Sequence, residues 1–155
     1  MTTKQSGRLI AENRKAFHEY HVVERFEVGI ALTGTEVKSA RAHHVNLRDS
    51  FARVDGGELW LERAHISPYE HGNRFNHDPW RRRRLLMKKH EIARLAGKIR
   101  EKGLTLVPLK MYWKGNWAKI DLGLVKGKAL YDKRDAIKER EGRRAVERAM
   151  RSAIR

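Results

Sequence analysis

The densest cluster of reactive side chains in the 155-residue chain is the arginine run from Arg81 to Arg84. Four consecutive guanidinium groups repel one another, and the phosphates of a nucleic acid would relieve that repulsion. The structural alternative is that the run leads, fully solvated, into the next helix. We favour binding, and the run therefore predicts contact with a polyanion.

The other reactive residues form no catalytic or metal-binding pattern. Eight histidines are present, but their spacings match no familiar set of metal ligands, and HExxH is absent. We expect most of them to be surface residues or phosphate contacts. The nucleophile-elbow, P-loop and dinucleotide-binding motifs are also missing. Most acidic residues have a basic neighbour within four positions, which suits ion pairs better than a nuclease centre. The sequence predicts no metal, no cofactor and no enzymatic activity.

Composition also indicates a polyanionic partner. The formal net charge is +16 and the pI about 10.6. A membrane surface is the weaker alternative, because no apolar run approaches the roughly 18 residues of a membrane span. The first residues lack the apolar stretch of a secretory signal, and the absence of cysteine fits an intracellular protein. We expect a cytoplasmic protein without a membrane segment.

A β-hairpin between Leu104 and Val125 is the element around which the chain is organised. Its first strand alternates apolar residues through Val107, Leu109, Met111 and Trp113, which predicts one buried face. Lys114-Gly115-Asn116 supplies the turn, and the alternation resumes from Ala118 to Leu124. Trp113 and Trp117 are interpreted as core or rim residues, with base stacking as the alternative.

Earlier segments add strands and two helices. Alternation from Tyr20 to Leu32 predicts a long strand, and a short helix over 36–43 follows, capped by Thr35. Asp55-Gly56-Gly57 predicts a second hairpin, between strands 51–54 and 58–66. A further helix begins near Leu85 and reaches Lys102, with Gly103 as its stop. The pattern has no βαβ alternation, so we expect a mainly β (α+β) fold, an OB-like closed β-barrel with peripheral helices.

Both ends of the chain are predicted to lie outside this barrel. Residues 1–16 are expected to be a flexible N-terminal arm, residues 17–128 the barrel, and residues 129–155 a basic tail. From Lys126 onward eleven Lys and Arg face five acids, a net charge of +6, with a narrow apolar stripe between Ala145 and Ile154. Small apolar residues bury too little area to hold a lone helix, so the tail should be disordered when free and helical when bound.

Three stretches resemble the SmpB family of bacterial SsrA-binding (tmRNA-binding) proteins. They are IAENRKAFHEYHVVERFEVGIALTGTEVKSAR from Ile10, GLTLVPLKMYWKGNWAKIDLGLVKGK from Gly103 and YDKRDAIKERE from Tyr131. The resemblance implies an OB-like barrel that binds the tRNA-like domain of tmRNA and delivers it to stalled ribosomes for trans-translation. It further implies contact with the small-subunit decoding region and mRNA channel, and indirect association, through tmRNA, with elongation factor Tu and alanyl-tRNA synthetase. A monomer is expected.

The resemblance also implies which residues bind. The expected RNA-binding residues are Asn13, Glu27, Arg41, Leu86, Lys119, Lys126 and Lys128, together with Arg83 from the arginine run. The expected ribosome-binding residues of the tail are Tyr131, Asp132, Lys133, Arg134, Ile137, Lys138 and Met150. Tyr131 stands where some family members have histidine, and Ala149 where a larger aliphatic residue can occur.

Two other classes of function fit the charge alone. A small basic nuclease would cleave RNA in a metal-dependent reaction. A structural ribosomal protein would stay on ribosomes through high salt. We favour a non-enzymatic RNA-binding adaptor for ribosome rescue.

Overall fold

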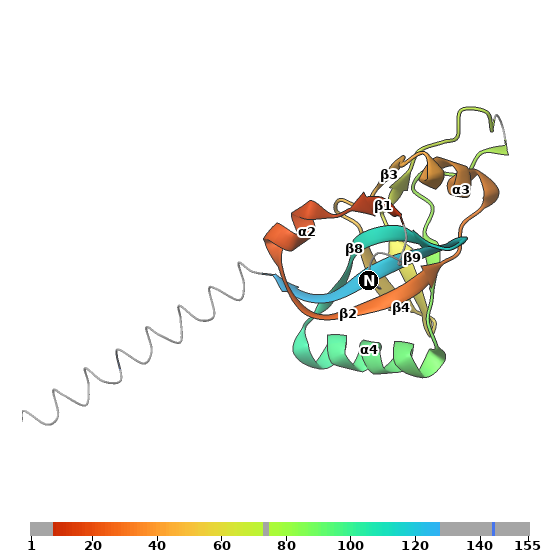
Figure 1. Cartoon of the computed structure of the whole chain (residues 1–155). Helices are drawn as coiled ribbons and strands as arrows, with labels where there is room; N and C mark the ends of the chain where they lie inside the picture. The colour runs from red at the N-terminus through yellow and green to blue at the C-terminus, as the bar shows by residue number, and fades with distance from the viewer. Residues whose placement is uncertain (1–7, 73–74, 128–143, 145–155) are drawn as a thin grey trace, which may run out of the picture.

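The computed structural model describes residues 8–72, 75–127 and 144, in which nine strands and three helices form (Figure 1). In chain order the elements are β1 (Leu9–Glu12), α2 (Arg14–Glu19), β2 (Tyr20–Ile30), α3 (Gly34–Arg41), β3 (Val45–Asn46), β4 (Phe51–Asp55), β5 (Glu58–Glu62), β6 (His65–Ile66), β7 (Arg83–Leu86), α4 (Lys89–Lys102), β8 (Thr105–Lys114) and β9 (Trp117–Gly127). The fold is mainly β, as the sequence predicts, but it has three helices where the sequence predicts two, because the short helix α2 lies in the segment expected to be a flexible arm.

Seven antiparallel strands form one sheet in the order β1-β8-β4-β5-β7-β2-β9, and β9 also pairs with β8. Six of these strands therefore pair in a ring that runs from β8 through β4, β5, β7, β2 and β9 back to β8. The β4–β8 link places Ala52 opposite Leu106. Strands β3 and β6 form a separate two-stranded sheet. Helix α4 lies at one end of the sheet, and α3 lies at the other end beside β3 (Figure 1).

The predicted hairpin is confirmed as β8 and β9. Gly115 has a φ of 62°, a left-handed conformation that favours glycine, and it begins the tight turn between the strands. Met111 and Ile120 are opposite one another and fully buried. The register shifts between Pro108 and Lys110, and this irregularity changes the parity of the residues that face the larger core, from Leu106 before it to Met111 after it.

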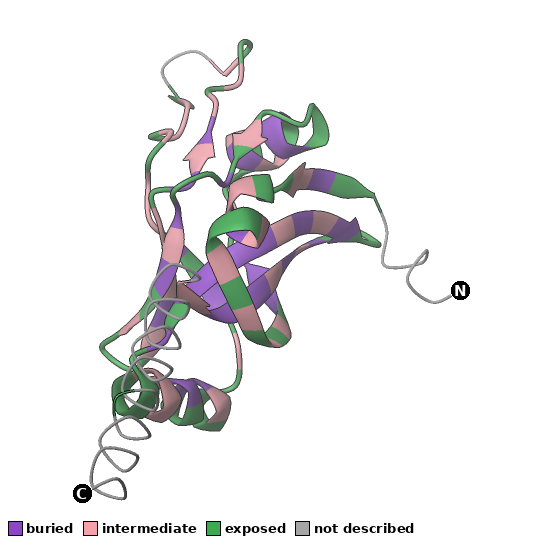
Figure 2. Cartoon of the chain, turned by 90° about the vertical axis from the view of Figure 1, so that its left-hand side faces the viewer, coloured by how far each residue is buried: buried purple, intermediate pink, exposed green. Residues whose placement is uncertain are grey.

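Burial on two sides of β8 was not predicted. The larger core includes Leu106, Met111 and Ile120, whereas Val107 and Leu109 join a second cluster with Ala16 from α2. Figure 2 shows the buried positions along the central strands and exposed turns on the helices. The sequence predicted one buried face because a strict period of two cannot represent a bulged strand.

The N-terminal arm is shorter than predicted. Residues 9–12 form β1 on the edge of β8, where Leu9 is opposite Tyr112, and residues 14–19 form α2. Ile10 is buried, and the Trp113 N–H donates to the Arg8 carbonyl at 2.8 Å. A strand of four residues is too short to show a periodicity in the sequence. Strand β1 was therefore not predicted, because it depends on its pairing with β8. Residues 1–7 lie outside the described chain.

The helices partly match their predictions. The α4 stop at Gly103 is confirmed, since Gly103 has a left-handed φ of 62° and its N–H donates to the Ile99 carbonyl. The start was wrong: Leu85 and Leu86 belong to β7, because Leu85 pairs with Leu59 of β5. Helix α3 begins two residues earlier than expected, with Thr33 in place of Thr35 as N-cap and the Thr33 N–H donating to Glu36 at 2.8 Å.

Candidate nucleic-acid interface

Three of the predicted RNA-binding residues come together on the outer face of β7, β2, β9 and β8. Leu86 is opposite Gly29, Gly29 is opposite Lys119, and Lys119 is opposite Tyr112. In the adjacent row, Glu27 is opposite Asp121, which is opposite Lys110. Because side chains two positions apart along a strand share a face, these rows form one continuous surface. We call it the outer sheet face.

Gly29, in the first of these rows, lets the Leu86 side chain pack directly against the backbone of β2. A Cβ at this position would lie 3.2 Å from the Leu86 Cβ, a tighter contact than most real side chains make. Leu86 therefore covers the space beside Gly29 and is itself 50 % exposed, unusually high for a leucine. The row offers an apolar contact next to the Lys119 ammonium.

Glu27 is held as a carboxylate on this face. Tyr112 donates its hydroxyl to Glu27 Oε2, and Lys114 Nζ donates to Glu27 Oε1 at 3.0 Å. These hydrogen bonds lower the pKa of Glu27 below its usual range, against a smaller effect of burial. Burial and the Glu27 bond raise the pKa of Tyr112, so the phenol keeps its proton and remains a donor. The carboxylate is fixed in place and can accept further hydrogen bonds from RNA.

The outer sheet face carries more positive than negative charge. Its charged residues are Arg25, Lys110, Lys114 and Lys119, against Glu27 and Asp121. Arg25 donates through both Nε and Nη2 to Asp121, at 3.3 Å for Nε. Lys110 and Lys119 form no ion pair with any residue in the described part of the chain. These two ammonium groups are available for phosphates.

The two tryptophans of the hairpin have different environments. Trp113 is 7 % exposed and belongs to the core, whereas Trp117 is 74 % exposed at the start of β9. Of the two expected places, core or rim, Trp113 takes the core, whereas Trp117 is exposed at the end of a strand. An exposed indole between Lys114 and Lys119 is suited to stacking on an unpaired base.

The arginine run is not a free cationic patch, and the prediction for Arg83 is wrong. Arg83 is fully buried, with Nε donating to Glu36 at 2.7 Å and Nη1 donating to the Ala64 carbonyl at 2.8 Å. Arg81 donates to the other Glu36 oxygen at 2.6 Å. Carboxylates within the chain thus relieve the repulsion, and the Arg83 side chain is inaccessible to RNA in this structure.

The flanking arginines are also engaged. Arg82 lies 3.9 Å from the centre of the Trp60 ring and 3.4 Å from Asp55. Arg84 is 3.4 Å from Glu58. Both contacts are at the surface, where ion pairs contribute little free energy, so these two arginines retain some capacity to meet phosphates.

Asn13 is structural as well. It is 4 % exposed; its Nδ2 donates to the Pro108 carbonyl at 2.9 Å and to the Leu47 carbonyl at 3.2 Å, and its Oδ1 accepts from the Ala16 N–H. One side chain therefore caps α2 and joins it to β8 and to the segment before β4. The prediction that Asn13 contacts RNA does not fit this buried position.

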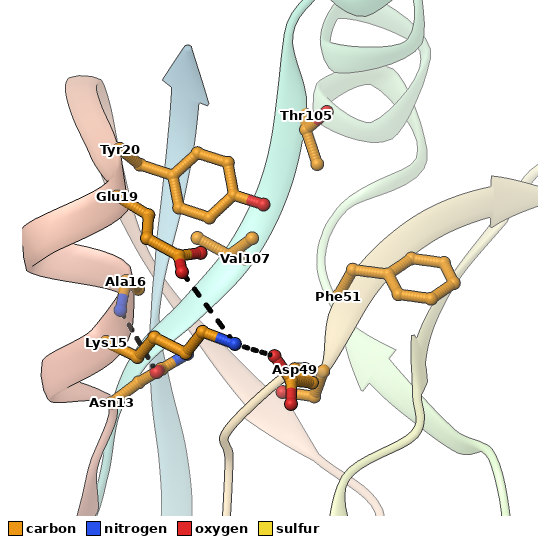
Figure 3. A pocket seen from close by; sticks show the side chains of 10 residues that line it. Asn13, Lys15, Ala16, Glu19, Tyr20, Asp49, Phe51, Thr105 and Val107 are labelled. Atoms are coloured by element: carbon orange, nitrogen blue, oxygen red, sulfur yellow. Dashed lines mark hydrogen bonds and ion pairs between the residues drawn. The ribbon is translucent and has the colours of Figure 1, made fainter. Parts of the chain in front are cut away.

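Asn13→Ala is expected to lower the free energy of unfolding by about 1–3 kcal/mol, because it removes a helix cap and the side-chain donor to the Pro108 carbonyl, whereas the Leu47 carbonyl still accepts from Ser50. Urea unfolding measures the loss. Lys15→Ala is the matched control, since Lys15 pairs with Asp49 at 2.6 Å on the exposed side of the same helix and should change stability little (Figure 3). Equal effects of the two substitutions would contradict the buried anchor.

A cavity of about 330 Å³ lies beside Asn13 (Figure 3). Lys15 Nζ lies across its mouth, 2.6 Å from Asp49 and 3.7 Å from Glu19, while Val107 and Phe51 supply apolar lining. Neither here nor elsewhere in the described residues do three or more His, Asp or Glu side chains gather as metal ligands. Nor does any helix of this part of the chain have the length and apolarity to cross a membrane.

The remaining predicted residues lie away from the outer sheet face or outside the described chain. Arg41 is exposed at the end of α3, in a separate cavity. Lys126 is opposite His21, at the far end of β9. Outside the described residues lie Lys128, Tyr131, Asp132, Lys133, Arg134, Ile137, Lys138 and Met150.

Sequence reasoning missed Tyr112, Lys114 and Arg25, which position the two carboxylates of the face. A signal was present: Lys110, Tyr112 and Lys114 have the parity opposite to the buried Met111 and Trp113, just as Lys119 and Asp121 do on β9. Their partners on β2 depend on strand order, which no local pattern specifies.

The fold and the site define a mainly β protein whose basic sheet face, with an exposed tryptophan, is of the kind that binds nucleic acid. Comparison with known proteins gives the particular family. The family model for SmpB protein matches residues 10–152, and the chain belongs to this family. The resemblance predicted from the sequence is thereby confirmed.

Two relatives are both named SsrA-binding protein. The one from Carboxydothermus hydrogenoformans is 66 % identical over 145 residues, covering 94 % of this chain and 97 % of the relative. The one from Pelotomaculum thermopropionicum is 59 % identical, covering 96 % and 97 %. A solved structure described as "tmRNA-SmpB: a journey to the center of the bacterial ribosome" is 55 % identical, with a TM-score of 0.64 over 76 % of this chain and 83 % of that one.

Proposed function

We propose that this protein binds the tRNA-like domain of tmRNA (SsrA RNA) and delivers it to stalled ribosomes for trans-translation. Membership of the SmpB family carries the proposal, since relatives that match nearly the whole chain are named for binding SsrA RNA. The similar solved structure concerns tmRNA, SmpB and the ribosome together. The outer sheet face supplies the chemistry that such binding needs.

Each part of the outer sheet face has a role in this function. Lys119 and Lys110 neutralise phosphates, and Trp117 offers a stacking surface. Leu86 supplies an apolar contact. Glu27, already ionised and held by Tyr112 and Lys114, accepts a hydrogen bond from a guanine edge or a ribose 2′-hydroxyl. Binding and positioning suffice for an adaptor, so no catalytic step is assigned.

The tail completes the function by acting on the ribosome. Residues 129–155 probe the empty decoding site and mRNA channel and fold as a helix there, with Tyr131 to Arg134, Ile137, Lys138 and Met150 as contacts. The net positive charge and the apolar stripe of the sequence support this role. Elongation factor Tu and alanyl-tRNA synthetase join through tmRNA. The protein acts as a cytoplasmic monomer, and the ring of strand pairings is an OB-like barrel.

Lys119→Ala is the direct test of the outer sheet face. Gel-shift titration against tmRNA, with elongator tRNA as competitor, should show weaker binding. The dependence of log affinity on log salt should become shallower by about 0.7–0.9, the contribution of one phosphate. Glu27→Ala should weaken tmRNA more than it weakens generic duplex RNA. Wild-type affinity that does not change with salt, or equal loss on both RNAs for Glu27→Ala, would contradict this assignment.

A further inference from the structure

A second concave site lies apart from the outer sheet face, where α3 ends and β1 begins. Its described lining residues are Arg8, Arg41, His43 and Trp113, and its volume is about 330 Å³. We call it the α3 pocket. Resting on the RNA-binding function proposed above, we propose that the α3 pocket binds a single nucleotide of the bound RNA, with its phosphate on the two arginines and its base against His43 and Trp113.

Backbone contacts bring the four residues together from three segments. The Trp113 N–H donates to the Arg8 carbonyl at 2.8 Å, which holds Arg8 beside β8. Arg41 is the last residue of α3, and His43 follows two positions later. His43 Nδ1 lies 3.4 Å from the Ile10 carbonyl, so the histidine is tied to β1. The pocket is therefore a product of the fold and not of one flexible loop.

The charge of the pocket favours an anion. No carboxylate is among its described lining residues, and the side chains of Arg8 and Arg41 form no ion pair or hydrogen bond within the described chain. Seven other arginines do pair with carboxylates: Arg14, Arg25, Arg53, Arg81, Arg82, Arg83 and Arg84. Two unpaired guanidinium groups on one cavity match the geometry of a phosphate.

The helix terminus beside the pocket does not cancel this charge. The end of a helix carries partial negative charge on its last carbonyl groups. Here the Lys38, Ser39 and Ala40 carbonyls accept from the N–H groups of Ala42, His44 and His43. Because these hydrogen bonds satisfy the carbonyl groups, the positive charges of Arg8 and Arg41 outweigh the negative end of the helix dipole in the pocket.

His43 points to a role beyond folding. Its φ is 64°, the left-handed conformation in which a residue just past a helix end is usually glycine. A histidine there is strained relative to glycine, so stability alone would not favour it. His43 is exposed and lines the pocket together with the largely buried Trp113. An imidazole beside an indole can stack on and hydrogen-bond to a nucleobase.

The size and position of the α3 pocket fit one nucleotide of a larger RNA. Its volume falls at the lower end of the about 300–1,000 Å³ typical of ligand pockets. Arg8 immediately precedes Leu9, which is opposite Tyr112 at the edge of the outer sheet face. An RNA bound on that face can therefore extend one nucleotide into the pocket.

The test compares two charge-matched double variants on the tRNA-like domain of tmRNA. R8Q/R41Q should lower affinity roughly tenfold at physiological salt and flatten the salt dependence by about 1.4–1.8, because two cations leave the interface. R94Q/R100Q removes the same charge from the exposed side of α4, at the other end of the sheet, and should have a much smaller effect (Figure 1). Equal losses of RNA affinity in the two double variants would contradict the proposal that the α3 pocket binds a nucleotide.

The His43→Gly variant distinguishes a role of His43 in binding a nucleotide from a purely structural role. The substitution relieves the positive φ and removes only the long 3.4 Å contact with the Ile10 carbonyl, so the melting temperature should change little while RNA affinity falls. If the RNA affinity of this variant were unchanged, His43 would not contact a base. The pocket would then bind a phosphate only, which contradicts the proposal. If wild-type protein showed no preference for tmRNA, the proposed function would fail. The two double variants would still report on the pocket with any RNA that the wild type binds.

Discussion

Replacing Arg83 with alanine is expected to lower the free energy of unfolding by about 3–5 kcal/mol. Glu36 and Arg83 are both fully buried, and the substitution removes the charge and the Nε hydrogen bond that Glu36 accepts at 2.7 Å. The Ala64 carbonyl loses its donor as well. Arg81 still reaches Glu36, which places the loss toward the lower end of this range. Chemical unfolding in urea measures it.

Arg84→Ala is the matched control, since it removes the adjacent guanidinium. The Arg84 side chain is half exposed and only pairs with Glu58 at 3.4 Å, so the expected loss is below about 1 kcal/mol. A comparable loss in both variants would mean that the run acts through its total charge. A large loss confined to Arg83→Ala would identify the buried pair as a structural lock between α3 and β7.

The same pair makes stability depend on pH. Burial raises the pKa of Glu36, but hydrogen bonds from Arg81 and the Thr33 N–H and the charge of Arg83 outweigh it and hold that pKa below its usual range. A lowered folded-state pKa stabilises fully above the unfolded value of about 4.3, and this contribution is lost as pH falls through the folded value. Arg83→Ala should therefore reduce the acid-induced loss of stability seen in the wild type.

Elements whose signals are local were predictable from the sequence. The β8–β9 turn, the left-handed Gly103 after α4 and the glycines between β4 and β5 each require a specific residue at a specific conformation. Periodicity then located the buried positions of β9. The bulge in β8 and the second core under α2 were missed, because one extra residue in a strand changes which face each later side chain takes.

The errors in the site have a different origin. Arg83 and Glu36 are 47 positions apart, so the sequence displays four arginines in a row but not the carboxylate that neutralises two of them. Asn13 reads as part of a polar terminus until Pro108 is placed beside it by the pairing of β1 with β8. Arg83 and Asn13, which were expected to contact RNA, are therefore structural residues because of their long-range partners. Glu27, Leu86 and Lys119 do lie together on one face.

Truncation after Tyr131 is expected to abolish peptide tagging on stalled ribosomes while leaving tmRNA affinity and thermal stability nearly unchanged. Within the described residues the last member of the buried core is Val125, and the outer sheet face and the α3 pocket precede Gly127. The truncation removes most of the basic tail, whose Lys and Arg side chains would replace counterions on ribosomal RNA. Gel-shift titration, thermal melting and a tagging assay measure the three properties.

Lys119→Ala supplies the opposite pattern and so serves as the control for the truncation. It keeps the tail but weakens tmRNA binding, so tagging should fall and recover as the variant concentration is raised, by mass action. The truncated protein should not recover at any concentration, because its defect follows delivery. Ordering a tail of this length costs several kcal/mol, which confines its binding to places where RNA surrounds it closely, and an mRNA-filled channel would exclude it. Loss of tmRNA binding on truncation, or tagging that recovers at high concentration, would show that the tail is part of the tmRNA-binding surface instead.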